Sequence, residues 1–110
     1  MGRSAILPPR AVKDSLTAWG AAIRTARTRR GWRRSDLATK SGVSASTLQA
    51  VERGAPGVGA AAYLTAMWAL GLLSRMAPLT DSNSDETGLL MEAQRRKTRV
   101  RLMGAADDDF

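Results

Sequence analysis

Hydrophobic residues recur at helical spacing through the first 78 residues of the chain. In the opening stretch they return every three or four positions, at Leu16, Trp19, Ile23 and Ala26. That spacing places the four side chains on one stripe of a helix. Asp14 or Ser15 is a suitable N-cap for this helix, and Gly31 is a suitable residue to end it. The pattern therefore predicts an amphipathic helix over residues 14–30.

Three shorter helices are predicted after the first. The second covers residues 34–41, and the fourth covers residues 60–70 with the apolar residues Tyr63, Leu64, Met67 and Leu70. Between them, a third helix begins after the N-cap residue Ser44 and ends near Arg53, with Leu48 and Val51 facing inward. A glycine directly follows each helix, at Gly42, Gly54 and Gly71. No strand is predicted here, so the expected fold is all-α, a compact bundle of four to five helices.

The two ends of the chain lack this periodicity. Residues 1–13 contain Pro8 and Pro9 and are predicted to be a disordered basic arm. The helical domain is expected over residues 14–78, followed over residues 79–110 by a polar linker and a flexible tail with a basic and an acidic part. Within the tail two interpretations stay open. Residues 89–96 could form a short helix, whereas residues 98–102 alternate weakly like a strand.

Composition narrows the chemistry that this chain can perform. The 110 residues include no Cys and no His. Their absence removes disulfides, Cys/His zinc sites, Cys nucleophiles and every catalytic triad with an imidazole base. We therefore expect no enzyme activity, no cofactor and no metal site.

Positive charge is concentrated in two blocks of the sequence. The net charge is +7, with nine basic residues against one acid in residues 1–34 and five against none in residues 95–103. Such blocks favour polyanions or anionic membranes as partners. The longest largely apolar run, residues 60–73, is too short for a bilayer span of roughly 20 residues. The start of the chain also lacks the apolar core of a secretory signal, so a cytoplasmic, nucleoid-associated location is expected.

A set of short motifs occurs in a specific order between Trp19 and Gly71. The motifs are Ile23, Arg27, Gly31-Trp32, Leu37-Ala38, Gly42-Val43-Ser44, Thr47-Leu48, Val51-Glu52-Arg53-Gly54 and Leu70-Gly71. In this order the segment resembles the helix-turn-helix domain of the Cro and phage-repressor (XRE) family. The resemblance implies a homodimer that binds a palindromic operator in double-stranded DNA. The residues expected at the dimer interface are Trp68, Leu72, Leu73 and Met76.

The third helix is the one that this resemblance places in the DNA major groove. Its expected base-contacting residues are Ser44, Ala45, Ser46, Gln49 and Ala50. Gln49 is the strongest candidate, because its amide can pair with adenine through two hydrogen bonds. For Ser44 a role as N-cap is the alternative to base contact, and both roles are compatible.

Phosphate contacts are expected from a second group of residues, Arg33, Arg34, Thr47 and Arg53. Thr47 could equally be an ordinary residue of the helix surface. Arg33 and Arg34 depart from the family, which usually has Ser or Thr and then Gln at these positions. The helix cap is therefore expected to be weaker here, while two arginines would strengthen contact with the DNA backbone.

Arg27 and Glu52 resemble a pair that joins the first helix to the end of the third helix in this family. We expect a partly buried ion pair with a structural role. Glu52 has no His or metal group beside it in the sequence pattern, so a role as general base is disfavoured.

The C-terminal third has a looser resemblance of its own. Its motifs are Leu70-Gly71-Leu72-Leu73, Gly88-Leu89-Leu90 and the basic cluster from Arg95 to Arg101. These are similar to HipB-like antitoxins, which implies a type II antitoxin that represses its own operon and neutralises a HipA-type Ser/Thr-kinase toxin. The alternatives are a stand-alone phage-type repressor or a protein-interaction module that does not read DNA. The small side chains of Ala45 and Ala50 keep the last alternative open.

Overall fold

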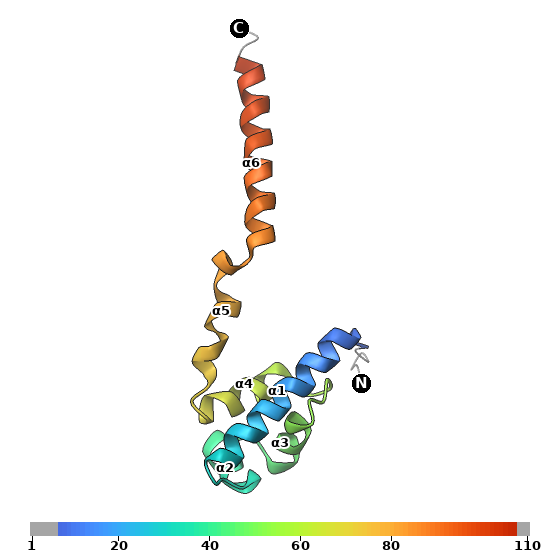
Figure 1. Cartoon of the computed structure of the whole chain (residues 1–110), viewed down its shortest axis with the longest axis vertical. Helices are drawn as coiled ribbons and strands as arrows, with labels where there is room; N and C mark the ends of the chain where they lie inside the picture. The colour runs from blue at the N-terminus through green and yellow to red at the C-terminus, as the bar shows by residue number, and fades with distance from the viewer. Residues whose placement is uncertain (1–6, 108–110) are drawn as a thin grey trace. The chain divides into compact units, whose positions relative to one another are not determined.

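Every regular element in residues 7–107, the part described by the computed structural model, is helical (Figure 1). The all-α prediction is confirmed. Residues 1–6 of the predicted arm and residues 108–110 of the predicted tail lie outside the described range. The chain divides into one unit that ends at Arg75 and a second unit that begins at Met76.

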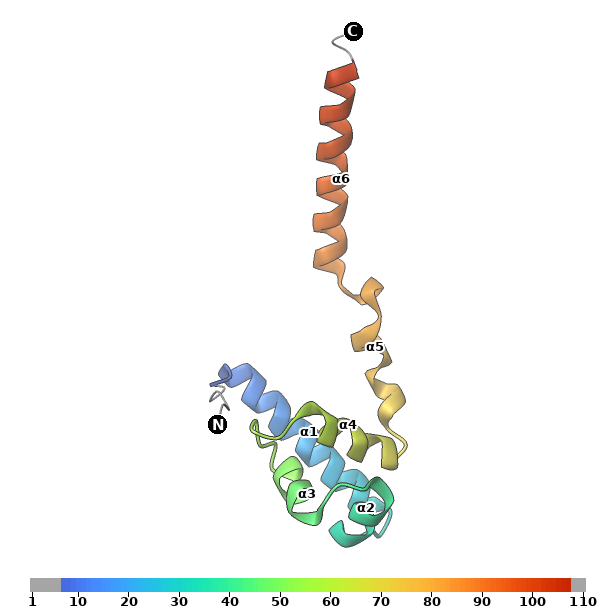
Figure 2. The same cartoon turned by 180° about the vertical axis from the view of Figure 1, so that it is seen from behind.

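Four α-helices build the first unit. They are α1 (Arg10–Arg29), α2 (Arg34–Ser41), α3 (Ala45–Glu52) and α4 (Ala60–Ala69). Helix α1 contacts α3 and α4, and α2 also contacts both of these helices. Figures 1 and 2 show α1 crossing α3 and α4 from the two opposite viewing directions. The short 3-10 helix η1 (Leu73–Met76) follows α4.

Helix α1 begins earlier than the pattern predicts. It starts at Arg10, so the expected start at Asp14 or Ser15 is wrong, and the last residues of the predicted arm are helical. Pro9 is the N-cap, and its carbonyl accepts hydrogen bonds from the backbone N–H groups of Val12 and Lys13 at 3.0 and 3.1 Å. Ser15 lies inside the helix, where its hydroxyl donates to the carbonyl of Ala11 at 2.9 Å.

The core of the first unit draws on all four helices. The buried apolar side chains are Ile23, Ala26, Leu37, Leu48, Val51, Tyr63, Ala66 and Leu70. Tyr63 is the largest of them, and its ring packs edge-on against Trp19 with 6.3 Å between ring centres. Its hydroxyl donates to the carbonyl of Ala55 at 2.8 Å. The core therefore holds the loop between α3 and α4 as well as the helices.

Backbone approaches backbone closely where α3 ends against α1. Gly54 has a φ of +75°, and a Cβ atom there would lie 2.6 Å from the backbone of Leu16 and Thr17. Gly20 lies on α1 one turn after Leu16. A Cβ atom at Gly20 would lie against the carbonyl oxygens of Val51 and Glu52. The two glycines let α3 lie directly on α1, which fixes the position of α3 in the fold.

An arginine links the end of α1 to the end of α4. Arg30 donates one hydrogen bond to the carbonyl of Ala26 at 2.7 Å and another to the carbonyl of Leu70 at 2.9 Å. The last carbonyls of a helix have no partner within the helix, so this contact satisfies one of them. Among residues 7–107 no helix is long and apolar enough to cross a membrane.

The second unit is also helical. It contains α5 (Ala77–Thr80), the 3-10 helix η2 (Ser82–Ser84) and α6 (Glu86–Asp107). The helical interpretation of residues 89–96 is confirmed, although the helix is longer than predicted. The weak strand signal over residues 98–102 is wrong, because the same continuous helix covers these residues. The Asp85 carboxylate accepts a hydrogen bond from the Gly88 N–H at 3.0 Å and so caps the start of α6.

Candidate nucleic-acid interface

A buried carboxylate at the end of α3 connects three helices. Glu52 Oε2 lies 2.6 Å from Arg27 Nε, and Glu52 Oε1 lies 3.0 Å from Arg27 Nη2. Arg34, at the start of α2, donates from its Nε to the same Oε1 at 3.1 Å. The remaining nitrogen of the Arg27 guanidinium, Nη1, donates to the carbonyl of Trp32 at 2.8 Å. The helices α1, α2 and α3 are therefore tied together through one side chain.

Burial and the neighbouring positive charges shift the pKa of Glu52 in opposite directions. The side chains of Arg27 and Glu52 are 9% and 2% exposed, whereas that of Arg34 is 41% exposed. Burial alone would raise the pKa of Glu52, but the hydrogen bonds from Arg27 and Arg34 outweigh it and lower the pKa below its usual value. The hydrogen bond to Glu52 raises the pKa of Arg27. The pair therefore stays charged and holds α3 in a fixed orientation.

The start of α2 carries a cap that sequence reasoning missed. Its N-cap residue, Arg33, has no capping side chain, and a weak cap was expected there. Asp36 supplies the missing interaction, because its Oδ2 accepts a hydrogen bond from the Arg33 N–H at 2.7 Å. The signal was present in the sequence, since an acidic residue three positions after the N-cap is half of a capping box. Arg33 itself is exposed.

Three hydroxyl groups gather at the start of α3. Ser44 Oγ accepts a hydrogen bond from the Thr47 N–H at 3.2 Å and donates one to Thr47 Oγ1 at 2.8 Å. Ser46 Oγ lies 3.3 Å from Ser44 Oγ. Ser44 is thus the N-cap of α3, the role that the sequence offered beside base contact. Thr47 is half-buried, and its hydroxyl serves the cap.

One face of α3 remains exposed while the other enters the core. Leu48, Val51 and Glu52 are buried. The exposed members of the predicted DNA-contacting set on this helix and its caps are Ser44, Ala45, Ser46, Gln49 and Arg53. Ala50 is only half-buried. Within the described residues the amide of Gln49 makes no hydrogen bond to the protein, so both of its ends are available to a ligand.

Further cations surround Trp32, in the connection between α1 and α2. Lys40 Nζ lies 4.7 Å from the centre of the Trp32 ring, and Arg30 Cζ lies 6.0 Å from it. Both distances are within the range of a cation–π contact. Sequence reasoning did not assign these two residues, because nothing local indicates that Lys40 and Arg30 meet at one ring.

The predicted dimer contacts differ in exposure. Trp68, on α4, is 60% exposed, and Leu73 is 40% exposed. Leu72 is half-buried against the core of the first unit. Met76 is half-buried and belongs to the second unit. A large aromatic side chain with this exposure leaves an apolar surface on α4 uncovered.

Two short helices joined by a tight turn at Gly42, with the second exposing a polar face, define a helix-turn-helix fold. A family model of the helix-turn-helix domain matches residues 18–77, which is more than half of the chain. The chain therefore belongs to the helix-turn-helix domain family, a class of DNA-binding domains that are typically not enzymes. No curated protein and no solved structure matches the chain. Residues 7–107 hold no group of three or more acidic, His or Cys side chains that could bind a metal ion.

Proposed function

We propose that this protein is a sequence-specific transcriptional repressor of the Cro and phage-repressor type, acting as a homodimer on a palindromic operator in the cytoplasm. The observation that carries the proposal is the exposed polar face of α3, held in one orientation by the buried contact between Arg27 and Glu52. A recognition helix must be rigidly placed, because base contacts depend on the position of a few side chains. The proposal assigns this role to α3.

Each predicted DNA contact has a definite place in this proposal. Gln49, exposed near the middle of α3, pairs with a base edge, with Ser44, Ala45, Ser46 and Ala50 as neighbouring contacts. Arg33, Thr47 and Arg53 contact backbone phosphates. Arg34 has its Nε on Glu52, which leaves its two terminal nitrogens to approach a phosphate from a fixed position.

The homodimer is the second part of the proposal. Trp68 and Leu73 are exposed apolar side chains that a second copy of the chain can cover. The proposal also assigns Leu72 and Met76 to the dimer contact. A two-fold dimer would present two α3 helices to half-sites about one turn of DNA apart.

Replacing Gln49 with alanine is expected to reduce the preference for the operator. The preferred sequence is first selected from a random duplex library with the wild-type protein. Binding to this duplex and to a scrambled duplex is then measured by fluorescence anisotropy. Loss of a two-hydrogen-bond contact with a base costs about 1–3 kcal/mol of discrimination, so the ratio of the two affinities should fall by roughly 5- to 150-fold.

Two further variants make the test specific. Gln94→Ala removes the same side chain from α6 and should leave the ratio unchanged. Arg33→Ala should weaken binding to both duplexes equally, since a phosphate contact carries no sequence information. Arg33 is a cleaner choice than Arg34, which also contacts Glu52. If selection enriches no sequence at all, the repressor assignment is wrong and the protein-interaction module replaces it.

We further propose that this repressor is a HipB-like antitoxin whose partner is a HipA-type kinase. Support comes from the C-terminal sequence resemblance and from three consecutive exposed apolar residues of α6, Leu89, Leu90 and Met91. Exposed apolar side chains within one turn of a helix offer apolar area that a protein partner can cover.

The antitoxin proposal predicts an inhibitory complex with a kinase encoded beside the protein's gene. The wild-type chain should copurify with this kinase and abolish its autophosphorylation, measured with labelled ATP. The double variant Leu89→Ser/Leu90→Ser, which changes no charge, should lose both effects and still bind the selected duplex. A neighbouring kinase that stays fully active with the wild-type chain would instead indicate a stand-alone phage-type repressor.

A further inference from the structure

The middle of α6 carries an unusually dense group of positive charges. Five of the seven residues from Arg95 to Arg101 are basic, and all five are exposed. Four are arginines, whose planar guanidinium groups match the geometry of phosphate oxygens. Within the described part of the chain only Arg96 among them has an acidic partner, Glu92 at 2.8 Å. The pair leaves four of the five cations without an acidic partner among the described residues.

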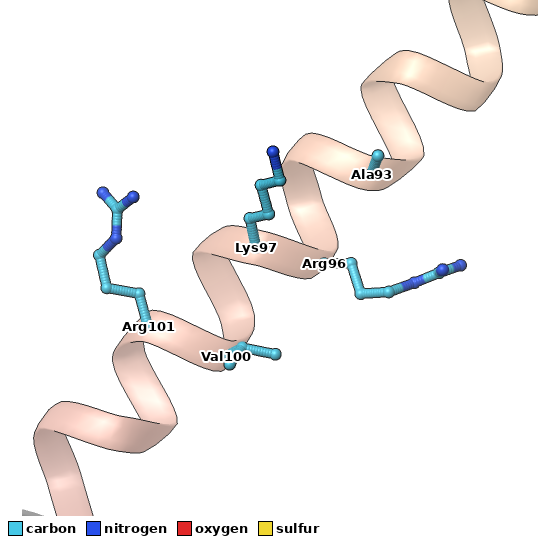
Figure 3. Close-up of a pocket in the computed structure, with 5 residues that line it drawn as sticks. All are labelled: Ala93, Arg96, Lys97, Val100 and Arg101. Carbon is cyan, nitrogen blue, oxygen red and sulfur yellow. The ribbon is translucent and has the colours of Figure 1, made fainter.

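These cations project from more than one side of the helix. Figure 3 shows Lys97 and Arg101 extending together from one side of α6, whereas Arg96 extends from another. With about 3.6 residues per turn, Arg95 and Arg99 share a face nearly opposite to that of Lys97 and Arg101. Glu92, Arg95, Arg96 and Arg99 line one surface hollow, and Ala93, Lys97, Val100 and Arg101 border another that also reaches Arg96. The helix is therefore positive on two opposite sides.

The cluster destabilises the helix that carries it. Arg95 with Arg99 and Lys97 with Arg101 are like-charge pairs four positions apart, and each opposes helix formation. Only the Glu92–Arg96 pair at this spacing is favourable. No residue from Glu86 to Gly104 is buried, so burial in a core does not compensate this repulsion. A polyanion would relieve it on both sides at once.

We propose that residues 95–101 of α6 form a second DNA-binding element, which lies in the groove of duplex DNA and contacts phosphates on both sides. The major groove admits an α-helix and is bordered by a phosphate backbone on each side. An acidic protein surface, in contrast, would approach the helix from one side. The first unit belongs to a family of DNA-binding domains, so α6 is tethered to the same duplex at high effective concentration. The proposal goes beyond the proposed function and does not require that α3 read a sequence.

Salt dependence of DNA binding by the full-length chain tests the proposal. Two double variants remove one side each, Arg95→Gln/Arg99→Gln and Lys97→Gln/Arg101→Gln. Neutralising one phosphate contact lowers the slope of log affinity against log salt by about 0.9, so each double variant should lower it by about 1.8. Because these variants reduce repulsion within α6, they should keep the helix content of the wild type, measured by circular dichroism.

A matched control separates a local effect from a change in net charge. Lys13→Gln/Arg24→Gln removes the same charge from exposed positions of α1 and should retain the wild-type slope. The α6 variants should weaken binding to the selected and the scrambled duplex by the same factor, which leaves sequence preference intact. A wild-type slope in both α6 variants would overturn the proposal, as would a slope reduced equally in the α1 control. If the wild-type chain binds the selected and the scrambled duplex equally well, only the repressor assignment is contradicted.

Discussion

Replacing Glu52 with alanine is expected to lower the free energy of unfolding by about 3–5 kcal/mol, because it leaves a buried arginine without a counter-charge. The Arg27 side chain is 9% exposed and donates two hydrogen bonds to the carboxylate of Glu52. The variant removes both bonds and also the contact with Arg34. Native domains have a stability of only about 5–15 kcal/mol, so chemical denaturation followed by circular dichroism should show a large shift of the midpoint.

The double variant Arg27→Met/Glu52→Leu serves as the control for this substitution. It removes both buried charges together, and apolar replacements of similar volume often cost little stability. It should therefore be clearly more stable than Glu52→Ala. An exposed salt bridge contributes at most about 1 kcal/mol. If Glu52→Ala lowered the free energy of unfolding by no more than this, the buried pair would not be what orients α3.

Acid provides a second measurement on the same residue. The folded protein lowers the pKa of Glu52, so its stabilising effect is complete above the usual carboxyl pKa and is lost as the pH falls through the lowered pKa. Wild-type stability should fall more steeply in this acidic range than the stability of the double variant, which lacks the carboxyl group.

The first unit was largely predictable because its signals are local. Helices α2, α3 and α4 lie where apolar periodicity and following glycines placed them. The exposed face of α3 followed from the same periodicity, because burial of Leu48 and Val51 determines which side faces outward. Whether that face contacts DNA remains a prediction.

Interactions between distant residues were less accessible to sequence reasoning. Arg30 donates a hydrogen bond to the carbonyl of Leu70, forty positions away. Arg34 donates to the Glu52 carboxylate that also accepts from Arg27, where three helices meet. Such contacts depend on how helices pack, and residue types alone do not specify this. The resemblance to a known family predicted the pair of Arg27 and Glu52. It did not predict the contact of Arg34 with Glu52, because this chain departs from the family at position 34.

Helix α6 was predicted only in part, as a short helix over residues 89–96 that was one of two interpretations of the tail. Periodicity detects a helix through the apolar stripe that it buries, and α6 buries no residue from Glu86 to Gly104. Its composition is nonetheless rich in residues of high helix propensity, such as Leu, Met, Gln, Arg and Lys. Intrinsic propensity was the better guide in this segment.

The second large effect is expected from alanine at Gly54, which should destabilise the first unit far more than alanine at Gly31. Both glycines have a positive φ, +75° and +68°, so both variants bear the strain of a left-handed backbone, roughly 1–2 kcal/mol. At Gly31 a Cβ atom meets nothing within 4 Å, whereas at Gly54 it would lie 2.6 Å from the backbone of Leu16 and Thr17.

Rigid backbone atoms cannot move aside as a flexible side chain can, so in Gly54→Ala the end of α3 must shift away from α1. Overpacking of this kind adds about 1–3 kcal/mol or more to the conformational strain. Thermal and chemical unfolding of the two variants, measured side by side, gives this difference directly. Because Glu52 lies two residues before Gly54, the shift should also disturb the contact with Arg27 and weaken DNA binding. Equal destabilisation of Gly54→Ala and Gly31→Ala would mean that the close approach of α3 to α1 contributes nothing beyond the turn.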